Sequence, residues 1–314
     1  MTRVLVTEPI HADAEALLRA AGCEVLHEVP AAEVDAVIVR VHPIGPDQMG
    51  GGQMAGGPMA GGQQGGGLRH ISKHGVGVDN IDLAAARAAS ITVTNTPGAN
   101  ANSVAEHALA LIFALAKSLP QMERVARAGE AAHGRARIVD IAGRRLLVVG
   151  FGASGRRLAA LAAAVGMQVT VLSRSLTGAQ TPEGYRVARD LGAALAEADV
   201  LSLHCPLSAA TRGMIGAAQL AALPAGAFVV NTARGGLIDE AALPGAEHLG
   251  GVALDVTEAE PLPAGSPLLH LPNCILTPHS AAASEGAFRQ MGMMAAQNVL
   301  DVLAGRVDPA RVVV

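Results

Sequence analysis

Apolar and polar positions follow two alternating patterns along the chain. Short apolar runs rich in β-branched residues predict strands in residues 3–9, 24–29, 35–40, 68–77 and 91–98, and helical spacing marks residues 13–22 and 81–89. A second series predicts strands in residues 145–152, 167–173, 198–207, 226–236, 250–256 and 274–280. Strands that alternate with helices build parallel sheets covered on both faces. The pattern therefore predicts an α/β fold with doubly wound parallel sheets.

A long helical pattern over residues 100–127 separates the two series. Ser103 followed by Glu106 predicts a capping box at its start. The next turns are apolar on nearly all sides, which predicts burial on several faces, between domains or between subunits. We therefore expect this helix to contribute to a homodimer contact.

The last helical pattern covers residues 284–304 and stops at Gly305. Its apolar face carries Phe288, Met291, Ala295, Val299 and Val302. The length of this helix predicts that the chain crosses back to pack on the first series.

Residues 49–67 interrupt the alternation. This glycine-rich segment, MGGGQMAGGPMAGGQQGGG, has no charge and few side chains that could pack. It is consistent with a loose surface connection, a flexible lid or an artificial stretch of sequence. No function is inferred from it.

Composition narrows the classes of function. The chain has 314 residues, enough for two domains, and a net charge of −4 with only 16% charged residues. This balance predicts no nucleic-acid partner and no membrane partner, and the low aromatic content of 2% disfavours base stacking. No segment is typical of a signal peptide or a membrane span. Three cysteines without CxxC or metal-ligand spacing predict a cytoplasmic protein without a metal site.

The segment VVGFGASGRRLA carries Gly150-x-Gly152-x-x-Gly155 between a predicted strand and a predicted helix. This is the context that the dinucleotide-binding motif requires. The first glycine permits the tight turn, the second lets the backbone approach a pyrophosphate, and the third lets the helix pack close to the strand. We therefore expect NAD or NADP to bind here.

The end of the next strand bears on the choice between the two cofactors. An NAD site normally places Asp or Glu there, where the carboxylate binds both ribose hydroxyls. Here the strand ends at Ser173, followed by Arg174 and Ser175, which could bind the 2′-phosphate of NADP. Arg174 could equally be a solvated surface residue, so both cofactors stay open.

Ionisable side chains stand at the ends of three later strands. Arg234 follows FVVNTA, Glu260 follows VALDV, and His279 ends ILTPH. Ligands gather at the carboxyl ends of strands in a doubly wound sheet. The three side chains are therefore candidates for catalysis on the side of the sheet where the cofactor would bind.

Seven segments share their order and context with one known family. They are HGVGVDNIDL, NTPGANANSVAEHALAL, GFGASG, LSLHCPL, NTARGGLIDE, ALDVTEAEPLP and LTPHSAAAS. The sequence resembles the D-2-hydroxyacid dehydrogenases from about residue 3 to residue 305, and most closely the short phosphoglycerate-dehydrogenase-like members. The resemblance implies a Rossmann cofactor domain in residues 96–283. It also implies a flavodoxin-like substrate domain in residues 1–95 and 284–314.

The resemblance assigns the three candidate catalytic residues. Arg234 would hold the substrate carboxylate and polarise the carbonyl oxygen. His279 would be the general acid/base, and Glu260 would hydrogen-bond its imidazole and favour the charged form. The substrate would be a phosphoglycerate- or hydroxypyruvate-like D-2-hydroxy acid, or the corresponding 2-keto acid.

The remaining site residues fall into two groups. The candidate cofactor-binding residues are Gly150, Gly152, Ala153, Ser154, Gly155, Ser173, Arg174, His204, Cys205, Pro206, Thr232 and Asp255, the last for the nicotinamide carboxamide. The candidate substrate-binding residues are Val76, Gly77, Asn102, Ser103 and Arg40. Arg40 could meet a phosphate or a second acid group, or be solvated.

Three positions depart from the family pattern. Only PGAE stands where a longer helix is usual, Thr257 replaces an aromatic residue, and a tryptophan expected near residues 131–143 is absent. Because the sequence ends at Val314, we expect no feedback control through a carboxy-terminal domain.

Two other functions are compatible with parts of this pattern. The first is a non-catalytic NAD(H)-sensing protein, similar to the co-repressors of the same fold. The absence of recruiting motifs favours an enzyme over it. The second is formate dehydrogenase, which would carry Gln as the partner of the histidine, so Glu260 argues against it.

Overall fold

The structure, a computed structural model, describes residues 1–49, 67–132, 134 and 136–314. Residues 50–66 of the glycine-rich segment therefore lie outside the described residues. The chain divides into two compact units, Met1–Asn100 with Ser284–Val314, and Ala101–Ala283. The first boundary between the units falls after Asn100, whereas the sequence predicted it after residue 95.

The first unit is built on a five-stranded sheet in which every pair is parallel. Its strands are β1 (Arg3–Val6), β2 (Glu24–Leu26), β3 (Ala36–Val39), β4 (His70–Lys73) and β5 (Thr92–Thr94). The spatial order β2-β1-β3-β4-β5 is the flavodoxin-like order. The predicted fold of this unit is confirmed.

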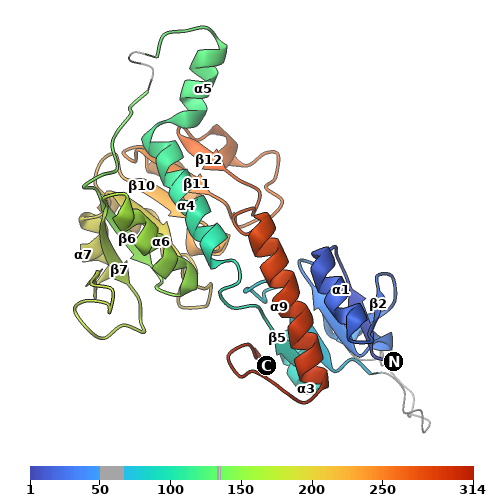
Figure 1. Cartoon of the computed structure of the whole chain (residues 1–314). Coiled ribbons are helices and arrows are strands. Elements are labelled where there is room, and N and C mark those ends of the chain that lie inside the picture. Colours follow the sequence, from blue (N-terminus) through green and yellow to red (C-terminus); the bar gives the residue numbers. More distant parts are fainter. Residues whose placement is uncertain (50–66, 133, 135) are drawn as a thin grey trace. The chain divides into compact units, whose positions relative to one another are not determined.

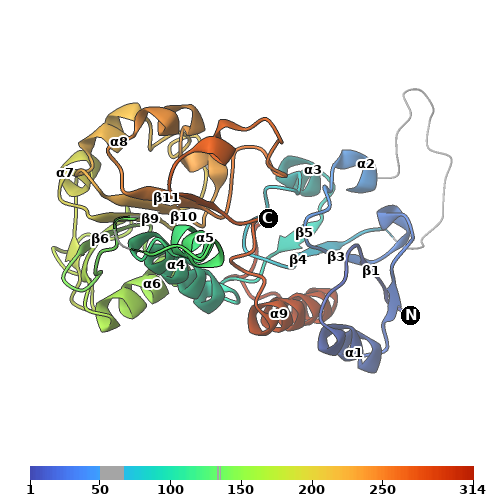
Figure 2. The same cartoon turned by 90° about the horizontal axis from the view of Figure 1, so that it is seen from above.

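Helices cover both faces of this sheet (Figure 2). Helix α1 (Ala12–Ala20) and helix α9 (Glu285–Leu303) lie on one face, with α2 (Pro46–Met49) and α3 (Leu83–Ala88) on the other; a short 3₁₀ turn, η1, spans Ala31–Glu33. The last helix does return to the first series, because Ala295, Ala296 and Val299 join a core with α1 and β1. Helix α9 is capped by Ser284, whose side chain accepts the Ala287 amide, and Gly305 ends it with a φ of 72°.

The second unit is built on a seven-stranded parallel sheet. Its strands are β6 (Arg145–Val149), β7 (Gln168–Leu172), β8 (Arg186–Val187), β9 (Val200–Leu203), β10 (Phe228–Asn231), β11 (Gly251–Leu254) and β12 (Cys274–Leu276). The order β12-β11-β10-β9-β6-β7-β8 is the Rossmann order extended by one strand. The pattern had predicted six of these strands and missed the two-residue edge strand β8.

Both faces of this sheet are buried, as its nearly continuous apolar strands require. In β6, Leu146 and Val148 face one core, which includes α4 (Ala101–Ala116) and α6 (Ala153–Ala164). Leu147 and Val149 face the opposite core, beside α7 (Leu191–Ala196) and α8 (Ala217–Ala222). Figure 2 shows the sheet between these two helical layers. The alternation along one strand thus places helices on both sides.

The predicted helix over residues 100–127 is two helices, which corrects the sequence analysis. Helix α4 ends at Ala116, and α5 (Leu119–Arg127) begins after Ser118, whose φ is 48°. The two axes differ by 57°. The apolar faces of α4 are buried within its own unit, against α6, β10 and β11. By contrast, α5 has no buried residue and projects from the unit in Figure 1.

The predicted capping box at Ser103 is also wrong, because the helix begins two residues earlier, at Ala101. The Ser103 hydroxyl donates to the Ala281 carbonyl oxygen at 2.6 Å instead of capping the helix. The Glu106 carboxylate accepts from the Asn102 side chain. Three short 3₁₀ segments complete the unit: η2 (Gly235–Leu237), η3 (Glu240–Gly245) and η4 (Pro267–His270).

No single helix among the described residues is long and apolar enough to cross a membrane. Helices α4 and α5 reach the required length and hydropathy only as a bent pair, and α4 is the buried core helix of its unit.

Candidate active site

The three glycines of the turn from β6 into α6 have two different roles. A Cβ on Gly150, whose φ is 97°, would lie 2.5 Å from the backbone of His204 and Cys205, and a Cβ on Gly155 would overlap the Gly150 carbonyl oxygen. A Cβ on Gly152 would meet nothing within 4 Å. Two glycines are therefore required by packing, whereas the third leaves open space at the amino terminus of α6. This space fits a pyrophosphate, which backbone N–H groups at a helix start would hold.

His204 connects the end of β9 to the first turn of α6. Its Nε2 lies 2.9 Å from the Ser202 hydroxyl and its Nδ1 lies 3.3 Å from the Ser154 hydroxyl. Burial lowers the pKa of His204 to about 4, so the ring is neutral near pH 7. The strand order reverses between β6 and β9, which is the switch point where such sheets bind ligands.

Cys205 and Pro206 follow at the same end of β9. The Cys205 thiol is half-buried, with its sulfur 3.8 Å from the Met214 sulfur. Burial raises the pKa of this thiol, although the nearby Arg174 guanidinium opposes the shift. The thiol is therefore a packing group near pH 7.

The end of β7 carries no carboxylate. Strand β7 ends at Leu172, and the hydroxyls of Ser173 and Ser175 lie 3.1 Å apart. Arg174, between them, is exposed. This edge thus offers two hydroxyls and a guanidinium where an NAD site normally has Asp or Glu.

Thr232 directly follows β10, and its side-chain hydroxyl makes no hydrogen bond to the described residues. The residue is 8% exposed, and within the described part of the chain its Oγ1 has no hydrogen-bond partner. A buried hydroxyl without a partner is costly unless a ligand or water completes it. Thr232 therefore fits a ligand-binding role.

Arg234 is held by a turn that the sequence analysis did not assign. The buried Asn231, the last residue of β10, donates from Nδ2 to the Arg234 carbonyl oxygen at 2.8 Å and accepts the Ala233 amide at 3.0 Å. The half-buried Arg234 donates from Nη1 to the Ala233 carbonyl oxygen at 2.6 Å. An asparagine ending a strand that is otherwise apolar was the available signal.

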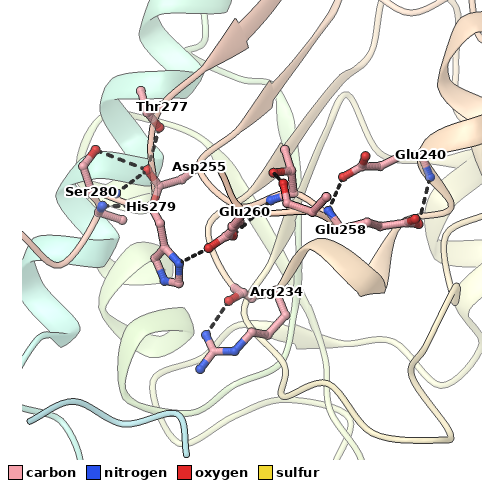
Figure 3. A network of polar contacts seen from close by, with 12 residues as sticks. Arg234, Glu240, Asp255, Glu258, Glu260, Thr277, His279 and Ser280 are labelled. Carbon is pink, nitrogen blue, oxygen red and sulfur yellow. Dashed lines mark hydrogen bonds and ion pairs between the residues drawn. The ribbon is translucent and has the colours of Figure 1, made fainter. Parts of the chain in front are cut away.

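His279 and Glu260 are hydrogen-bonded. The imidazole Nδ1 lies 2.7 Å from Glu260 Oε2, and the two side chains are 49% and 39% exposed (Figure 3). The backbone at His279 has a φ of 50°, and its amide donates to the Asp255 and Thr277 carbonyl oxygens at 2.7 and 3.0 Å. Since Nδ1 is engaged by Glu260, Nε2 is the ring atom left to exchange a proton.

The turn that carries Glu260 is tied down on both sides. Glu260 Oε1 accepts the Thr257 amide at 3.2 Å, and the Thr257 hydroxyl donates to the Ala259 carbonyl oxygen at 2.8 Å. Glu240 and Glu258 each accept the backbone amide of the other, at 2.5 and 3.3 Å. Burial, with the charges of Glu258 and Glu260, raises the pKa of Glu240. Thr257, where the family is usually aromatic, thus closes the turn by hydrogen bonding.

The loops of Arg234 and Glu260 lie in direct contact. A Cβ on Gly235, the residue after Arg234, would overlap the backbone of Thr257 and Glu258. Figure 3 shows Arg234 beside the Glu260–His279 pair. The second unit therefore brings together all three residues that the sequence analysis proposed for catalysis.

Asp255 is placed differently from the other site residues. Its carboxylate is fully buried, and it accepts from the Thr277 hydroxyl at 2.6 Å, the Ser280 amide at 2.8 Å and the Ala281 amide at 2.9 Å. The Ser280 hydroxyl is a fourth donor at 3.3 Å. Asp255 therefore anchors the loop of His279, and its proposed contact with a nicotinamide carboxamide stays a prediction.

The predicted substrate residues are divided between the units. Asn102 and Ser103 belong to the second unit, where Arg157 donates to the Asn102 side chain at 2.7 Å. Val76 and Gly77 follow β4 in the first unit, and the Asn95 side chain donates to the Val76 carbonyl oxygen at 2.8 Å. Their role in substrate binding stays a prediction.

Arg40 ends β3 in the first unit. Its guanidinium donates to the Pro9 carbonyl oxygen at 3.1 Å and lies 5.0 Å from the Phe288 ring centroid. Its backbone amide donates to Glu8. Across the described ranges, no three His, Cys, Asp or Glu residues are grouped as metal ligands.

Comparison with known proteins identifies the second unit first. Residues 109–281 match the family model described as D-isomer specific 2-hydroxyacid dehydrogenase, NAD binding domain. A solved protein of Thermus thermophilus is 37% identical, with a TM-score of 0.86 and complete coverage of both chains.

Curated relatives extend the match over both units. The D-3-phosphoglycerate dehydrogenase of Archaeoglobus fulgidus is 35% identical over 96% of this chain and 58% of its own length. The glyoxylate reductase of Aeropyrum pernix is 37% identical over 77% of this chain and 75% of its own. The chain thus spans 58% of the phosphoglycerate dehydrogenase that it matches.

Proposed function

The chain belongs to the D-isomer-specific 2-hydroxyacid dehydrogenases, and from that premise we propose that it interconverts a D-2-hydroxy acid and the corresponding 2-keto acid with NAD or NADP. One observation carries the proposal: His279 and Glu260 are paired at 2.7 Å beside Arg234, in the unit that holds the dinucleotide-binding turn. When bound, the cofactor supplies or accepts the hydride at C2.

Proton transfer is the task of His279. Glu260 holds Nδ1, so Nε2 gives a proton to the substrate oxygen during reduction and removes it during oxidation. The carboxylate of Glu260 also fixes the orientation of the imidazole ring through this hydrogen bond. Arg234 binds the substrate carboxylate and polarises the C2 carbonyl, because its guanidinium forms charge-assisted hydrogen bonds.

The cofactor residues proposed from the sequence keep their roles in this proposal. Gly150, Gly152, Ala153, Ser154 and Gly155 would form the pyrophosphate turn, and Thr232 would use its unpaired hydroxyl on the cofactor. His204, Cys205 and Pro206 would line the adenosine side, and Asp255 would accept from the carboxamide.

We propose that Ser173 and Arg174 admit NADP, because no carboxylate stands at the end of β7 to repel the 2′-phosphate. The variant Ser173→Asp is expected to shift the ratio of kcat/KM for NADPH over NADH toward NADH by about tenfold, the effect of roughly 1.4 kcal/mol of charge repulsion. Ser175→Asp, two residues farther from the strand end, is the matched comparison. An unchanged ratio in Ser173→Asp would exclude this role for the strand end.

The substrate class is proposed to be phosphoglycerate- or hydroxypyruvate-like. The D-3-phosphoglycerate dehydrogenase and the glyoxylate reductase support this range of small acids. Val76 and Gly77 would bind the substrate carboxylate through backbone amides, and Arg40 would meet a phosphate or second acid group. Asn102 and Ser103 would contribute further polar contacts to the substrate.

A steady-state panel tests the proposed activity. Phosphohydroxypyruvate, hydroxypyruvate, glyoxylate and pyruvate are each reduced with NADH and with NADPH, and oxidation of the cofactor is followed by absorbance. Turnover of at least one acid supports the proposal. Cofactor binding without any turnover would instead support a non-catalytic NAD(H)-binding protein.

We also propose a homodimer and a cytoplasmic location. Helix α5 has no buried residue and exposes Leu119 to 52%, so a second copy could cover it. The mass of the protein in sedimentation experiments tests the dimer. Cys23, Cys205 and Cys274 are free thiols, which is consistent with a reducing compartment.

A further inference from the structure

His107 is the histidine of α4 that the sequence analysis left without a role. It is half-buried, and its Nε2 lies 3.1 Å from the Thr277 hydroxyl and 3.5 Å from Asp255 Oδ1. Thr277 and Asp255 belong to the segments that carry His279 and Glu260. We infer that His107 is a positioning residue of the active site: through Thr277 and Asp255 it holds the loop of the general acid/base. This inference rests on the proposed function for its effect on catalysis.

Counting donors fixes the direction of each hydrogen bond. The Thr277 hydroxyl has one hydrogen, and the Asp255 carboxylate, which accepts from two backbone amides, takes it at 2.6 Å. The Thr277 oxygen must then accept from His107, so Nε2 of His107 carries a hydrogen. The chain runs from His107 Nε2–H to the Thr277 hydroxyl and on to Asp255 Oδ1.

Asp255 is hydrogen-bonded to the loop that carries His279. Its carboxylate accepts the amides of Ser280 and Ala281, the two residues after His279, and its carbonyl oxygen accepts the amide of His279 itself. Three consecutive amides are thus fixed by one residue. Because His279 has a left-handed φ of 50°, the loop depends on such bonds to keep the imidazole aimed at Glu260.

The burial of Asp255 explains why its carboxylate needs hydrogen-bond donors from side chains in addition to the two backbone amides. A carboxylate without exposure to solvent must be satisfied by hydrogen bonds, and losing one leaves a buried charge poorly compensated. Removing the donor of His107 therefore leaves Thr277 free to turn away from Asp255. The effect reaches His279 although His107 does not contact it.

The test compares two isosteric deletions with their conservative replacements. His107→Leu and Thr277→Val remove the donor and the hydroxyl, whereas His107→Gln and Thr277→Ser keep them. We expect the deletions to lower kcat about tenfold with KM for cofactor and keto acid within about twofold, because the loss concerns the aim of a reacting group. The conservative variants are expected to recover at least half of the loss on a logarithmic scale.

The double variant sharpens the assignment. If His107 acts only through Thr277, His107→Leu combined with Thr277→Val loses no more than either alone. His248→Leu and Thr181→Val are controls in the same unit. The exposed His248 side chain bonds to the Leu220 carbonyl oxygen, and the buried Thr181 hydroxyl accepts the Tyr185 amide. Equal losses in the controls, or additive losses in the double variant, would overturn the inference.

A readout without turnover separates this inference from the proposed function. Hydrogen–deuterium exchange of the peptide covering residues 276–283 is expected to speed up about tenfold in His107→Leu and Thr277→Val, because the Ser280 and Ala281 amides lose a firm acceptor. If the unaltered protein turns over none of the four acids, the proposed activity fails, and exchange still decides the role of His107. Unchanged exchange and unchanged kcat in both deletions would overturn it.

Discussion

In the second unit, Arg234, Glu260 and His279, which follow β10, β11 and β12, remain partly exposed, and Glu260 and His279 pair with each other. In the first unit, those at the ends of β1, β3 and β4 bond mostly to backbone. Glu8 accepts the amides of residues 40, 41 and 42, and Lys73 donates to the Arg40 carbonyl oxygen and to Asn80. Both units are doubly wound parallel sheets.

This difference shows what the shared architecture leaves open. A parallel sheet collects loops at the carboxyl ends of its strands, but it does not decide whether their charges face solvent or stabilise the loops themselves. Where the charges keep exposed atoms, proton transfer is possible. Where they are engaged by backbone, as Glu8 is, the charges hold the loops in place.

The largest expected effect concerns the second unit. His279→Asn removes the group that exchanges the proton, so kcat for 2-keto acid reduction should fall by about 10²–10⁴. The control is His270→Asn, an exposed residue that ends η4 in the same unit. A loss of less than tenfold for His279→Asn would contradict the proposed difference between the two units, in which proton transfer takes place at the strand ends of the second.

The second largest effect is a difference in acid sensitivity between the units. Among the described residues, the first unit holds two buried neutral histidines and the second holds one. Burial lowers the pKa of His70 to about 3 and, with the charges of Arg40 and Lys73, that of His74 to about 4; burial also lowers the pKa of His204 to about 4. A depressed pKa means that the unfolded chain takes up the proton first. The stability is therefore fully present above pH 6.5 and is lost as pH falls from 6.5 toward 4 and below.

Between pH 7 and pH 5 each histidine should cost about 2 kcal/mol, hence about 4 in the first unit and about 2 in the second. Urea unfolding at both pH values measures this. Hydrogen exchange follows the first unit, and fluorescence of Tyr185, the single tyrosine of the chain, follows the second. Equal acid sensitivity of the two units would contradict the expectation. His70→Gln should remove part of the difference.

The glycines of the β6–α6 turn give a comparison within one unit. Gly155→Ala forces a Cβ onto the Gly150 carbonyl oxygen and should destabilise the second unit by about 1–3 kcal/mol, as overpacking does. Gly152→Ala meets open space, so it should leave Tm unchanged while weakening NADH binding in a fluorescence titration. Equal changes in Tm for the two variants would show that the open space has no special role.

The smallest expected effect tests the first unit. Arg40→Gln should lower kcat/KM for phosphohydroxypyruvate about tenfold more than for hydroxypyruvate, since one charge-assisted contact to phosphate is lost. Arg69→Gln, an exposed residue of the same unit that pairs with Asp35, is the control. The same change for both acids would show that this edge binds no second acid group.

Much of this molecule followed from local patterns. The apolar runs predicted eleven of the twelve strands in the described part of the chain, and the motif around Gly150 predicted the turn into α6. These features depend on near neighbours, because periodicity and glycine conformation act over a few residues. Arg234, Glu260 and His279 could be proposed as candidates for the same reason, since each stands shortly after a strand that is evident from its own residues.

The sequence by itself thus determined the two sheets, the dinucleotide-binding turn and the identity of the catalytic candidates. Only the tertiary structure decided that the helix over residues 100–127 breaks at Ser118, that Ser103 donates to Ala281, and that Asn231 and His107 support the site. The contacts of Ser103 and His107 depend on partners supplied by packing, whereas Asn231 bonds to Ala233 and Arg234 within its own turn. Ser103 and Ala281 are 178 residues apart, and His107 and Thr277 are 170 apart, so no local pattern could reveal those contacts.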